Sequence, residues 1–540
     1  MKNFSFFKNT FFYKPAIVAL LLGLSRLPLK AGFLCFFAFL PLFSWFDEKV
    51  HYKKIIYGGL VFSTVYTAVS LHWISLVTFP GFIGLFILFG IYFSLLFWII
   101  SRIWTTFPKF KFLTFISFWI SFEYLQNFGE FRFPWFNIGY SLTDYLKLIQ
   151  PADIGGIYLL SILVIIINIF IFRLRRKFIL NIIFLFLVFF IWNSYGANRL
   201  KKIEIEETSV NVAIVQVSIP QEKKWQQTYL DTTLSLYETY TKIAAESGSD
   251  LVIWPEGAMP IYLLKSTKHR SFVRGLAIEN QVDIFTGFPH YERAPVTHKN
   301  KFLHYNSCTK LDKDGHISPV YKKNVLVPFG ERIPFLKIFP FLWNVHLGQA
   351  NWEYGTEQKF YKIGKYNYSP LICFEIAFPG LTTKMAQQDV DFIVNITNDA
   401  WFKRSAGTYQ HAMMTKIRAV ETRKQIYRAA NTGYSLVVSP LGEIINETKL
   451  YEKIVINDNL LICENNSIFT KKLYWFPLVF VILSGLIFLR YLLQKKKGTR
   501  MARILRIVTD KMDREKKVKS KKKNYLSAVF SVNQRFKKKD

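Results

Sequence analysis

The chain has 540 residues, of which 51% are hydrophobic and 18% aromatic, including 54 phenylalanines. This composition excludes a single soluble domain and predicts that part of the chain lies in lipid. The net charge of +33 is compatible with a nucleic acid, an anionic lipid surface or the cytoplasmic anchoring of membrane helices. The position of the charge along the chain must therefore decide between these partners.

Apolar segments long enough for helices that cross a bilayer dominate both ends of the chain. Eight are found, at residues 14–28, 31–47, 54–77, 81–101, 110–128, 155–174, 178–195 and 473–493. They predict an α-helical polytopic membrane bundle over residues 1–197 and a C-terminal transmembrane helix over 473–493. Basic residues gather in alternate loops, for example at 173–177, so the positive-inside rule places residues 198–472 outside the cytoplasm.

Residues 198–472 have a different pattern, in which short β-rich runs alternate with helical stretches. The predicted strands are Val210–Ser218, Leu251–Trp254, Val282–Gly287, Ile317–Val320, Tyr368–Cys373, Asp391–Thr397 and Tyr434–Ser439. The predicted helices are Tyr229–Glu246 and His411–Arg423. This alternation predicts one α/β domain built on buried sheets.

The tail, residues 494–540, holds 18 Lys and Arg against 4 acidic residues, a net +14. It carries no nucleic-acid-binding motif, so we expect no nucleic-acid partner. A cytoplasmic tail near anionic lipid headgroups explains the charge better. The tail is expected to be either a solvated anchor for the topology or an amphipathic helix on the membrane surface.

The cysteines are Cys35, Cys308, Cys373 and Cys463, and their spacing fits neither a zinc site nor a disulfide framework. We therefore expect no metal, and no cofactor motif is found. Whether Cys308 pairs with Cys463 stays open.

Three residues in the α/β segment have the chemistry of a nucleophilic site. A thiol reacts as thiolate, so Cys373 at the end of its apolar run requires a base. Glu256 follows Leu251–Trp254 and is a candidate general base. Lys323 is a candidate cation for an oxyanion, although its neighbour Lys322 is equally basic. Each residue also has a structural alternative: a buried thiol, a surface carboxylate or a solvated lysine.

In this order, Glu256, Lys323 and Cys373 resemble the Glu–Lys–Cys triad of the nitrilase (carbon–nitrogen hydrolase) superfamily, which implies an α-β-β-α sandwich. Further segments are similar to the apolipoprotein N-acyltransferases within that superfamily. They are Val215–Trp225, Trp254-Pro255-Glu256, Leu326–Glu331, Thr397–Phe402, Gln410-His411, Arg428–Gly433 and, in the membrane part, Phe133–Ser141.

The resemblance implies supporting roles for five more residues. Glu331 would orient Lys323, Glu375 would shape the site beside the thiol, and Asn306 matches a required asparagine. Trp225 matches a tryptophan on a loop beside the site, and Phe374 stands where a tyrosine commonly follows the nucleophile. Two positions depart from the family pattern: Phe374 lacks the hydroxyl, and Lys403 replaces the usual glycine after Trp-Phe.

The activity implied is N-acylation through a Cys373 thioester, from a phospholipid acyl donor to the N-terminal diacylglyceryl-cysteine of an apolipoprotein. The site would lie on the periplasmic side of a bacterial inner membrane, with the tail in the cytoplasm. The aromatic side chains of Phe339, Phe341 and Trp343 are candidates for lipid contacts.

Two other functions compete with this one. A membrane-bound amidase would keep the triad, but a small polar substrate would not need eight spans. A transporter with an inert outer domain is disfavoured by the scarcity of charge within the spans.

Overall fold

The computed structural model describes residues 12–48, 50–296, 300–336, 338–339, 341–342, 351–464 and 466–536. The chain divides into two compact units, Met1–Val481 and Ile482–Asp540. The first unit contains a helical bundle and a β-sandwich, and the site lies within it.

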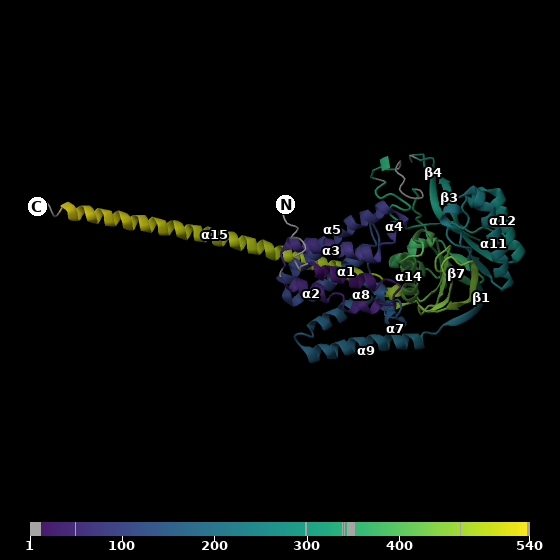
Figure 1. Ribbon diagram of the computed structural model, residues 1–540, viewed down its shortest axis with the longest axis horizontal. Helices are drawn as coiled ribbons and strands as arrows, with labels where there is room; N and C mark the ends of the chain where they lie inside the picture. The colour runs from purple at the N-terminus through teal and green to yellow at the C-terminus, as the bar shows by residue number, and fades with distance from the viewer. Residues whose placement is uncertain are drawn as a thin grey trace, which may run out of the picture. The chain divides into compact units, whose positions relative to one another are not determined.

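Each of the eight predicted apolar segments contains helix in the structure (Figure 1). The first helices are α1 (Tyr13–Leu24), η2 (Gly32–Phe36), α2 (Leu40–Asp47), α3 (Tyr52–Ser70), α4 (Ile74–Val77), α5 (Phe79–Thr106), η3 (Pro108–Phe110) and α6 (Lys111–Leu125). They are followed by η4 (Ile138–Leu142), α7 (Leu146–Ile149), α8 (Ala152–Arg173) and α9 (Phe178–Lys202), and the chain ends in η10 (Phe469–Leu473) and α15 (Phe476–Phe536).

Among the described residues, four helices are long and apolar enough to cross a membrane: Phe79–Thr106, Ala152–Arg173, Phe178–Lys202 and the Phe476–Lys496 part of α15. The apolar helices Tyr13–Leu24 and Gly32–Asp47 are shorter. Crossing by the remaining predicted segments therefore stays a prediction.

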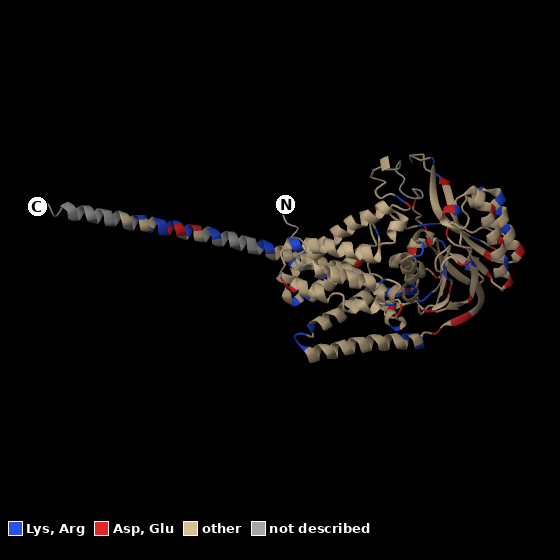
Figure 2. Ribbon diagram, in the orientation of Figure 1, with Lys and Arg blue, Asp and Glu red and all other residues tan. Residues whose placement is uncertain are grey.

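Charged residues are sparse in the bundle helices in Figure 2, but among the described residues of the bundle three charged side chains are buried: Arg26, Glu123 and Asp153. Arg26 Nη1 donates to the carbonyl oxygens of Trp135 at 2.9 Å and Asn137 at 3.1 Å. Glu123 Oε1 accepts from the Trp119 indole and from the Ile138 N–H, both at 3.0 Å. Arg26 and Glu123 thus fix the segment around residues 135–138, a structural role that explains buried charge without a transport pathway.

The α/β part consists of two six-stranded sheets. The first has the order β12-β1-β2-β3-β4-β5 and the second β11-β10-β9-β8-β7-β6. The first sheet contains β1 (Glu206–Gln216), β2 (Leu251–Ile253), β3 (Asp283–Arg293), β4 (Phe302–Leu311), β5 (Tyr321–Lys322) and β12 (Ile454–Ile462). The second contains β6 (Tyr361–Ile363), β7 (Tyr366–Ile372), β8 (Phe392–Thr397), β9 (Gln425–Ala430), β10 (Leu436–Val438) and β11 (Ile444–Glu447).

The sheets are covered by helices on their outer faces, as expected for an α-β-β-α sandwich (Figure 1). The helices of this part are α10 (Gln221–Lys224), η5 (Gln227–Tyr229), α11 (Leu230–Glu246), η6 (Leu263–Lys265), α12 (Thr267–Asn280), η8 (Cys373–Ala377), α13 (Pro379–Ala386), η9 (Asp399–Phe402) and α14 (Ala406–Thr422).

Side-chain alternation along β1 creates the layers. Ala213 and Val215 pack in one core with α11 and α12, whereas Val212 and Ile214 pack in the other core with β7, β8 and β9. Because successive side chains of a strand point to opposite faces, one apolar strand contributes to both cores. Within each sheet the central strands are parallel, β1-β2-β3 and β7-β8-β9.

Several sequence-based boundaries are corrected by the structure. The strand before Lys323 is β5 (Tyr321–Lys322), and Ile317 makes only an isolated bridge to Leu311. The helix predicted from His411 begins at Ala406, where the Ser405 hydroxyl accepts from the Gly407 N–H, a typical N-cap.

The structure also describes some of the cysteine and aromatic side chains named above. Cys308 and Cys463 do not form a disulfide. Phe339 and Phe341 are exposed, whereas Trp343 lies outside the described residues.

Candidate active site

A cavity of about 440 Å³ is lined by residues of both the sandwich and the bundle. Seven of the eight residues that the sequence singled out line it: Glu256, Lys323, Cys373, Glu331, Asn306, Trp225 and Phe374. Apolar residues of the bundle complete the wall, among them Trp73, Ile74, Val77, Leu85, Leu88, Phe133 and Trp135.

Glu256 follows β2, at the carboxyl end of a parallel strand, where α/β sheets gather their ligands. Asn306 Nδ2 donates to its Oε1 at 2.6 Å, and the N–H of Asn398 donates to its Oε2 at 2.9 Å. The Lys323 ammonium lies 3.5 Å from Oε1. Both carboxylate oxygens are therefore fixed, and the group faces a cavity where it can exchange a proton.

Lys323 follows β5 and is completely buried. Its Nζ donates to Glu331 Oε1 at 2.8 Å, and Asn306 Nδ2 donates to the same oxygen at 3.0 Å. Burial alone would lower the pKa of Lys323, but the charges of Glu331 and Glu256 outweigh it and the pKa lies above its usual value. The two carboxylates therefore favour the ammonium form of Lys323.

Lys322 points away from this cation, as expected for adjacent residues on a strand. Its Nζ lies 2.6 Å from Glu292 Oε2 and over the Tyr305 ring. Of the two lysines, Lys323 is therefore the one that lines the cavity.

Cys373 stands at the turn where β7 passes into η8. Its φ of +52° is in the left-handed region, which is strained for a residue with a side chain and common at functional sites. Burial raises the pKa of the thiol, Glu256 adds to the rise, and Lys323 opposes it. These surroundings therefore favour the thiol over the thiolate, which is the form that reacts.

Glu375 does not line the cavity, but it binds the backbone of two segments that do. Its carboxylate accepts from the N–H groups of Asn324 at 2.6 Å, Val325 at 3.1 Å and Ile372 at 2.7 Å, and from the Tyr321 hydroxyl at 3.0 Å. Burial raises the pKa of Glu375 to about 7, against the Ile372 N–H bond and the charge of Lys323. One carboxylate thus joins the backbone after Lys323 to the backbone before Cys373.

Lys224 is a cavity residue that the sequence reasoning missed. It is buried, and its Nζ donates to the Glu256 carbonyl oxygen at 2.7 Å. Burial lowers the pKa of Lys224 to about 8, although Glu256 and Cys373 oppose the shift. The run Glu222-Lys223-Lys224 has the pattern of a solvated surface, so no signal in the sequence marked it. Trp225, the next residue, is 46% exposed at the edge of the cavity.

Both parts of the chain are similar to known families. Residues 18–170 match the apolipoprotein N-acyltransferase N-terminal domain, and residues 211–458 match the carbon-nitrogen hydrolase family. An apolipoprotein N-acyltransferase of Geobacter metallireducens is 33% identical over 66% of this chain and 70% of its own length. One from Rickettsia typhi is 31% identical over 82% of this chain and 90% of its own. The chain belongs to the apolipoprotein N-acyltransferases.

Membership of this family makes the chain a membrane acyltransferase that acts by N-acylation in lipoprotein maturation. It favours the acyltransferase over the amidase and the transporter that the sequence left in competition. Among solved structures, a variant of an amidase of the nitrilase superfamily from Nesterenkonia is 17% identical, with a TM-score of 0.39 over 51% of this chain and 98% of that one.

The two departures from the family pattern have structural consequences here. Phe374 is buried and stacks on Trp135 and Phe133, with ring centroids 6.1 and 6.2 Å apart. The Phe374 side chain, which has no hydroxyl, thus packs the residue after Cys373 against the bundle. Lys403 has φ +50°, a conformation that glycine adopts without strain.

Proposed function

We propose that Cys373, Glu256 and Lys323 transfer an acyl chain from a phospholipid to the α-amino group of the diacylglyceryl-cysteine of an apolipoprotein. The observation that carries the proposal is the shared cavity, in which a partly buried thiol, a carboxylate and an ammonium group lie beside a wall of apolar bundle residues. Such a wall suits a lipid chain, since each buried CH₂ contributes about 0.8 kcal/mol.

In the first step, Cys373 Sγ attacks the ester carbonyl of the donor while Glu256 accepts the thiol proton. The Lys323 ammonium stabilises the oxyanion of the tetrahedral intermediate. The bond to the glycerol oxygen then breaks, and that oxygen takes the proton from Glu256 as the lysophospholipid leaves. The acyl group remains on sulfur as a thioester.

In the second step, the neutral amine of the acceptor attacks the thioester, and Glu256 accepts a proton from the nitrogen. The carbon–sulfur bond breaks, the thiolate takes that proton back, and an amide is released. The contacts of the Glu256 carboxylate support its role as the group that carries the proton, because Asn306, Asn398 and Lys323 hold it in place. Glu331 and Asn306 would orient Lys323 and Glu256, and Trp225 would border the path of the substrates.

The test is the N-terminal peptide of a lipoprotein, analysed by mass spectrometry from cells with and without this protein. A third acyl chain, amide-linked, is expected only when the protein is present. The Cys373→Ala, Glu256→Gln and Lys323→Met variants should each fail to add it. Full acylation by any of the three would overturn the assignment of the triad.

We also propose the topology: residues 1–197 as a seven-helix membrane region, 198–472 as a periplasmic catalytic domain, 473–493 as the returning helix and 494–540 as a cytoplasmic tail of an inner-membrane protein. A membrane-impermeant maleimide should label a cysteine introduced at the exposed Lys268 in intact spheroplasts. A cysteine introduced at Lys516 should react only after the membrane is broken. The reverse pattern would invert the topology.

A further inference from the structure

His411 on α14 lies beside the nucleophile but contacts its backbone. Its Nε2 lies 3.2 Å from the carbonyl oxygen of Cys373. Its Nδ1 lies 3.0 Å from Asp399 Oδ1 and 3.1 Å from Arg428 Nη2. A carbonyl oxygen only accepts hydrogen bonds, so the contact requires a hydrogen on Nε2. The imidazolium satisfies this, and so does the neutral tautomer in which Nδ1 accepts from Arg428.

The partners of His411 are themselves fixed. Arg428 on β9 pairs with Asp399 Oδ2 at 2.7 Å and donates to Asn395 Oδ1 at 2.7 Å. The imidazole, the carboxylate and the guanidinium are all buried. Such a network holds the ring in one orientation, because moving any member leaves a buried polar group without its partner.

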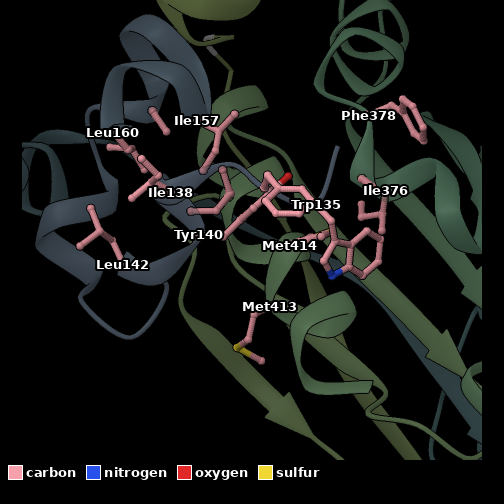
Figure 3. Close-up of a cluster of buried hydrophobic side chains, with 14 of the residues drawn as sticks. Trp135, Ile138, Tyr140, Leu142, Ile157, Leu160, Ile376, Phe378, Met413 and Met414 are labelled. Carbon is pink, nitrogen blue, oxygen red and sulfur yellow. The ribbon is translucent and has the colours of Figure 1, made fainter. Parts of the chain in front are cut away.

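The residue before His411 ties the same helix to the bundle. Gln410 Oε1 accepts from the indole N–H groups of Trp135 at 2.9 Å and Trp73 at 3.2 Å, and Gln410 Nε2 donates to the Ser70 carbonyl oxygen at 3.0 Å. Figure 3 shows Trp135 close to Met414 of the same helix and to Ile376 of η8. The start of α14 is therefore held on both sides, by the bundle and by the second sheet.

We propose that His411 is a positioning residue that fixes the peptide group between Cys373 and Phe374. A peptide group is planar, so a bond to its carbonyl oxygen also sets the direction of its N–H. The N–H in question belongs to Phe374, and in this proposal it faces the oxyanion beside Lys323. The Cys373 backbone is in a strained conformation, which persists only when its surroundings hold it. His411 supplies that hold.

A Cys–His catalytic pair would use the imidazole differently, to remove the thiol proton. The structure records the Nε2 contact to the carbonyl oxygen, and the base of the proposed function is Glu256. The inference rests on that proposed function, because it requires acyl transfer to sulfur.

The experiment compares two substitutions in the full-length protein. A glutamine amide nitrogen occupies about the place of histidine Nε2, and an asparagine amide nitrogen that of Nδ1. His411→Gln therefore keeps a donor for the Cys373 carbonyl, whereas His411→Asn keeps a polar group only at the Nδ1 position, beside Asp399 and Arg428. Single-turnover formation of the acyl-enzyme from labelled phospholipid should be within about threefold of wild type for Gln and about 10- to 100-fold slower for Asn.

Alkylation of Cys373 by iodoacetamide, followed on its own peptide by mass spectrometry, separates positioning from collapse of the site. This reaction forms no oxyanion, so both variants should alkylate at rates within about threefold of wild type. Equal acylation rates for Asn and Gln, or a parallel loss of alkylation and acylation in Asn, would overturn the inference. If wild type forms no acyl-enzyme, the proposed function itself fails.

A second variant covers the case in which the asparagine protein does not accumulate in membranes. Asp399→Asn leaves the imidazole in place but weakens the contact that fixes Nδ1, so acylation should fall at least about threefold while alkylation does not fall. Unchanged acylation, or an equal fall of both rates, would again overturn the inference.

Discussion

The two walls of the cavity are built by opposite physical means. The sandwich wall carries Glu256, Lys323 and Glu331, joined by contacts of 2.8 and 3.5 Å, while the bundle wall presents apolar side chains such as Leu85 and Phe133. A buried charge without a partner costs several kcal/mol, so the first wall depends on exact pairing partners. The second wall contributes in proportion to the apolar area it covers. Changes in the first wall should therefore alter rate, and changes in the second should alter the choice of acyl chain.

The largest effect is expected from removing the cation of the sandwich wall. Lys323→Met deletes the oxyanion partner and leaves Glu331 without its 2.8 Å contact. We expect kcat to fall at least about 10²-fold. Lys322→Met is the matched control, since Lys322 is partly exposed and pairs with Glu292, and it should stay within about twofold. Steady-state assays of both variants that gave equal rates would remove Lys323 from the chemistry.

A smaller loss is expected from Glu375→Gln. All the recorded contacts of this carboxylate are hydrogen bonds that it accepts, and an amide would turn one oxygen into a donor that faces donors. The cost should be about 1–3 kcal/mol of stability with roughly a tenfold lower kcat. Thermal unfolding in detergent and activity assays measure both. Glu357→Gln, at an exposed site, is the control, and an unchanged Tm for Glu375→Gln would contradict the anchoring role.

The bundle wall should be sensitive to shape. Leu85→Trp on α5 narrows the cavity, whereas Ile87→Trp on the same helix changes a side chain that is 63% exposed. Loss of contact with about two methylene groups, about 0.8 kcal/mol each, corresponds to roughly a tenfold change. We expect Leu85→Trp to disfavour palmitoyl over octanoyl donors by about that factor in competition assays, and Ile87→Trp to leave the ratio as in wild type. A fall in rate that is independent of acyl-chain length would show that Leu85 affects the rate, as residues of the sandwich wall are expected to, and not the choice of acyl chain.

The smallest effect concerns pH. Since burial and Glu256 raise the pKa of the Cys373 thiol, its thiolate fraction at neutral pH is low and grows as pH rises. The alkylation rate of Cys373 should therefore still be climbing at pH about 9, where a short cysteine peptide, with a pKa of about 8.5, has begun to level off. An alkylation rate that levels off below pH about 8 would mean that Cys373 is already a thiolate in the protein without substrate.

The sequence predicted the features that depend on local pattern. Strands such as Leu251–Trp254 and Asp391–Thr397 were identified because their apolar runs are continuous and end in turns. The structure has β2 and β8 at these places. The three candidate site residues are predicted from their flanking motifs; Glu256 and Cys373 follow such runs, whereas the segment Ile317–Val320 before Lys323 is not a strand. Their roles stay a prediction, whereas their position in one cavity is a structural finding.

Features that depend on long-range contacts were missed. β12 joins β1 from more than two hundred residues away, and β4 has His304, Asn306 and Lys310 within its run, which hides its alternation. The burial of Lys224 and the contact of His411 with the Cys373 carbonyl arise only when distant segments meet. Composition and local spacing do not predict contacts between residues that are far apart in the chain.

The central claim is that Cys373 carries the acyl group between the two substrates. The most direct test is to incubate the purified full-length protein with dipalmitoyl phospholipid without an acceptor, and to map the palmitoyl adduct by mass spectrometry. We expect a hydroxylamine-sensitive adduct on the Cys373 peptide in wild type and in Cys308→Ala, and none in Cys373→Ala. An active wild-type protein that forms no adduct, or forms it on another residue, would contradict the account.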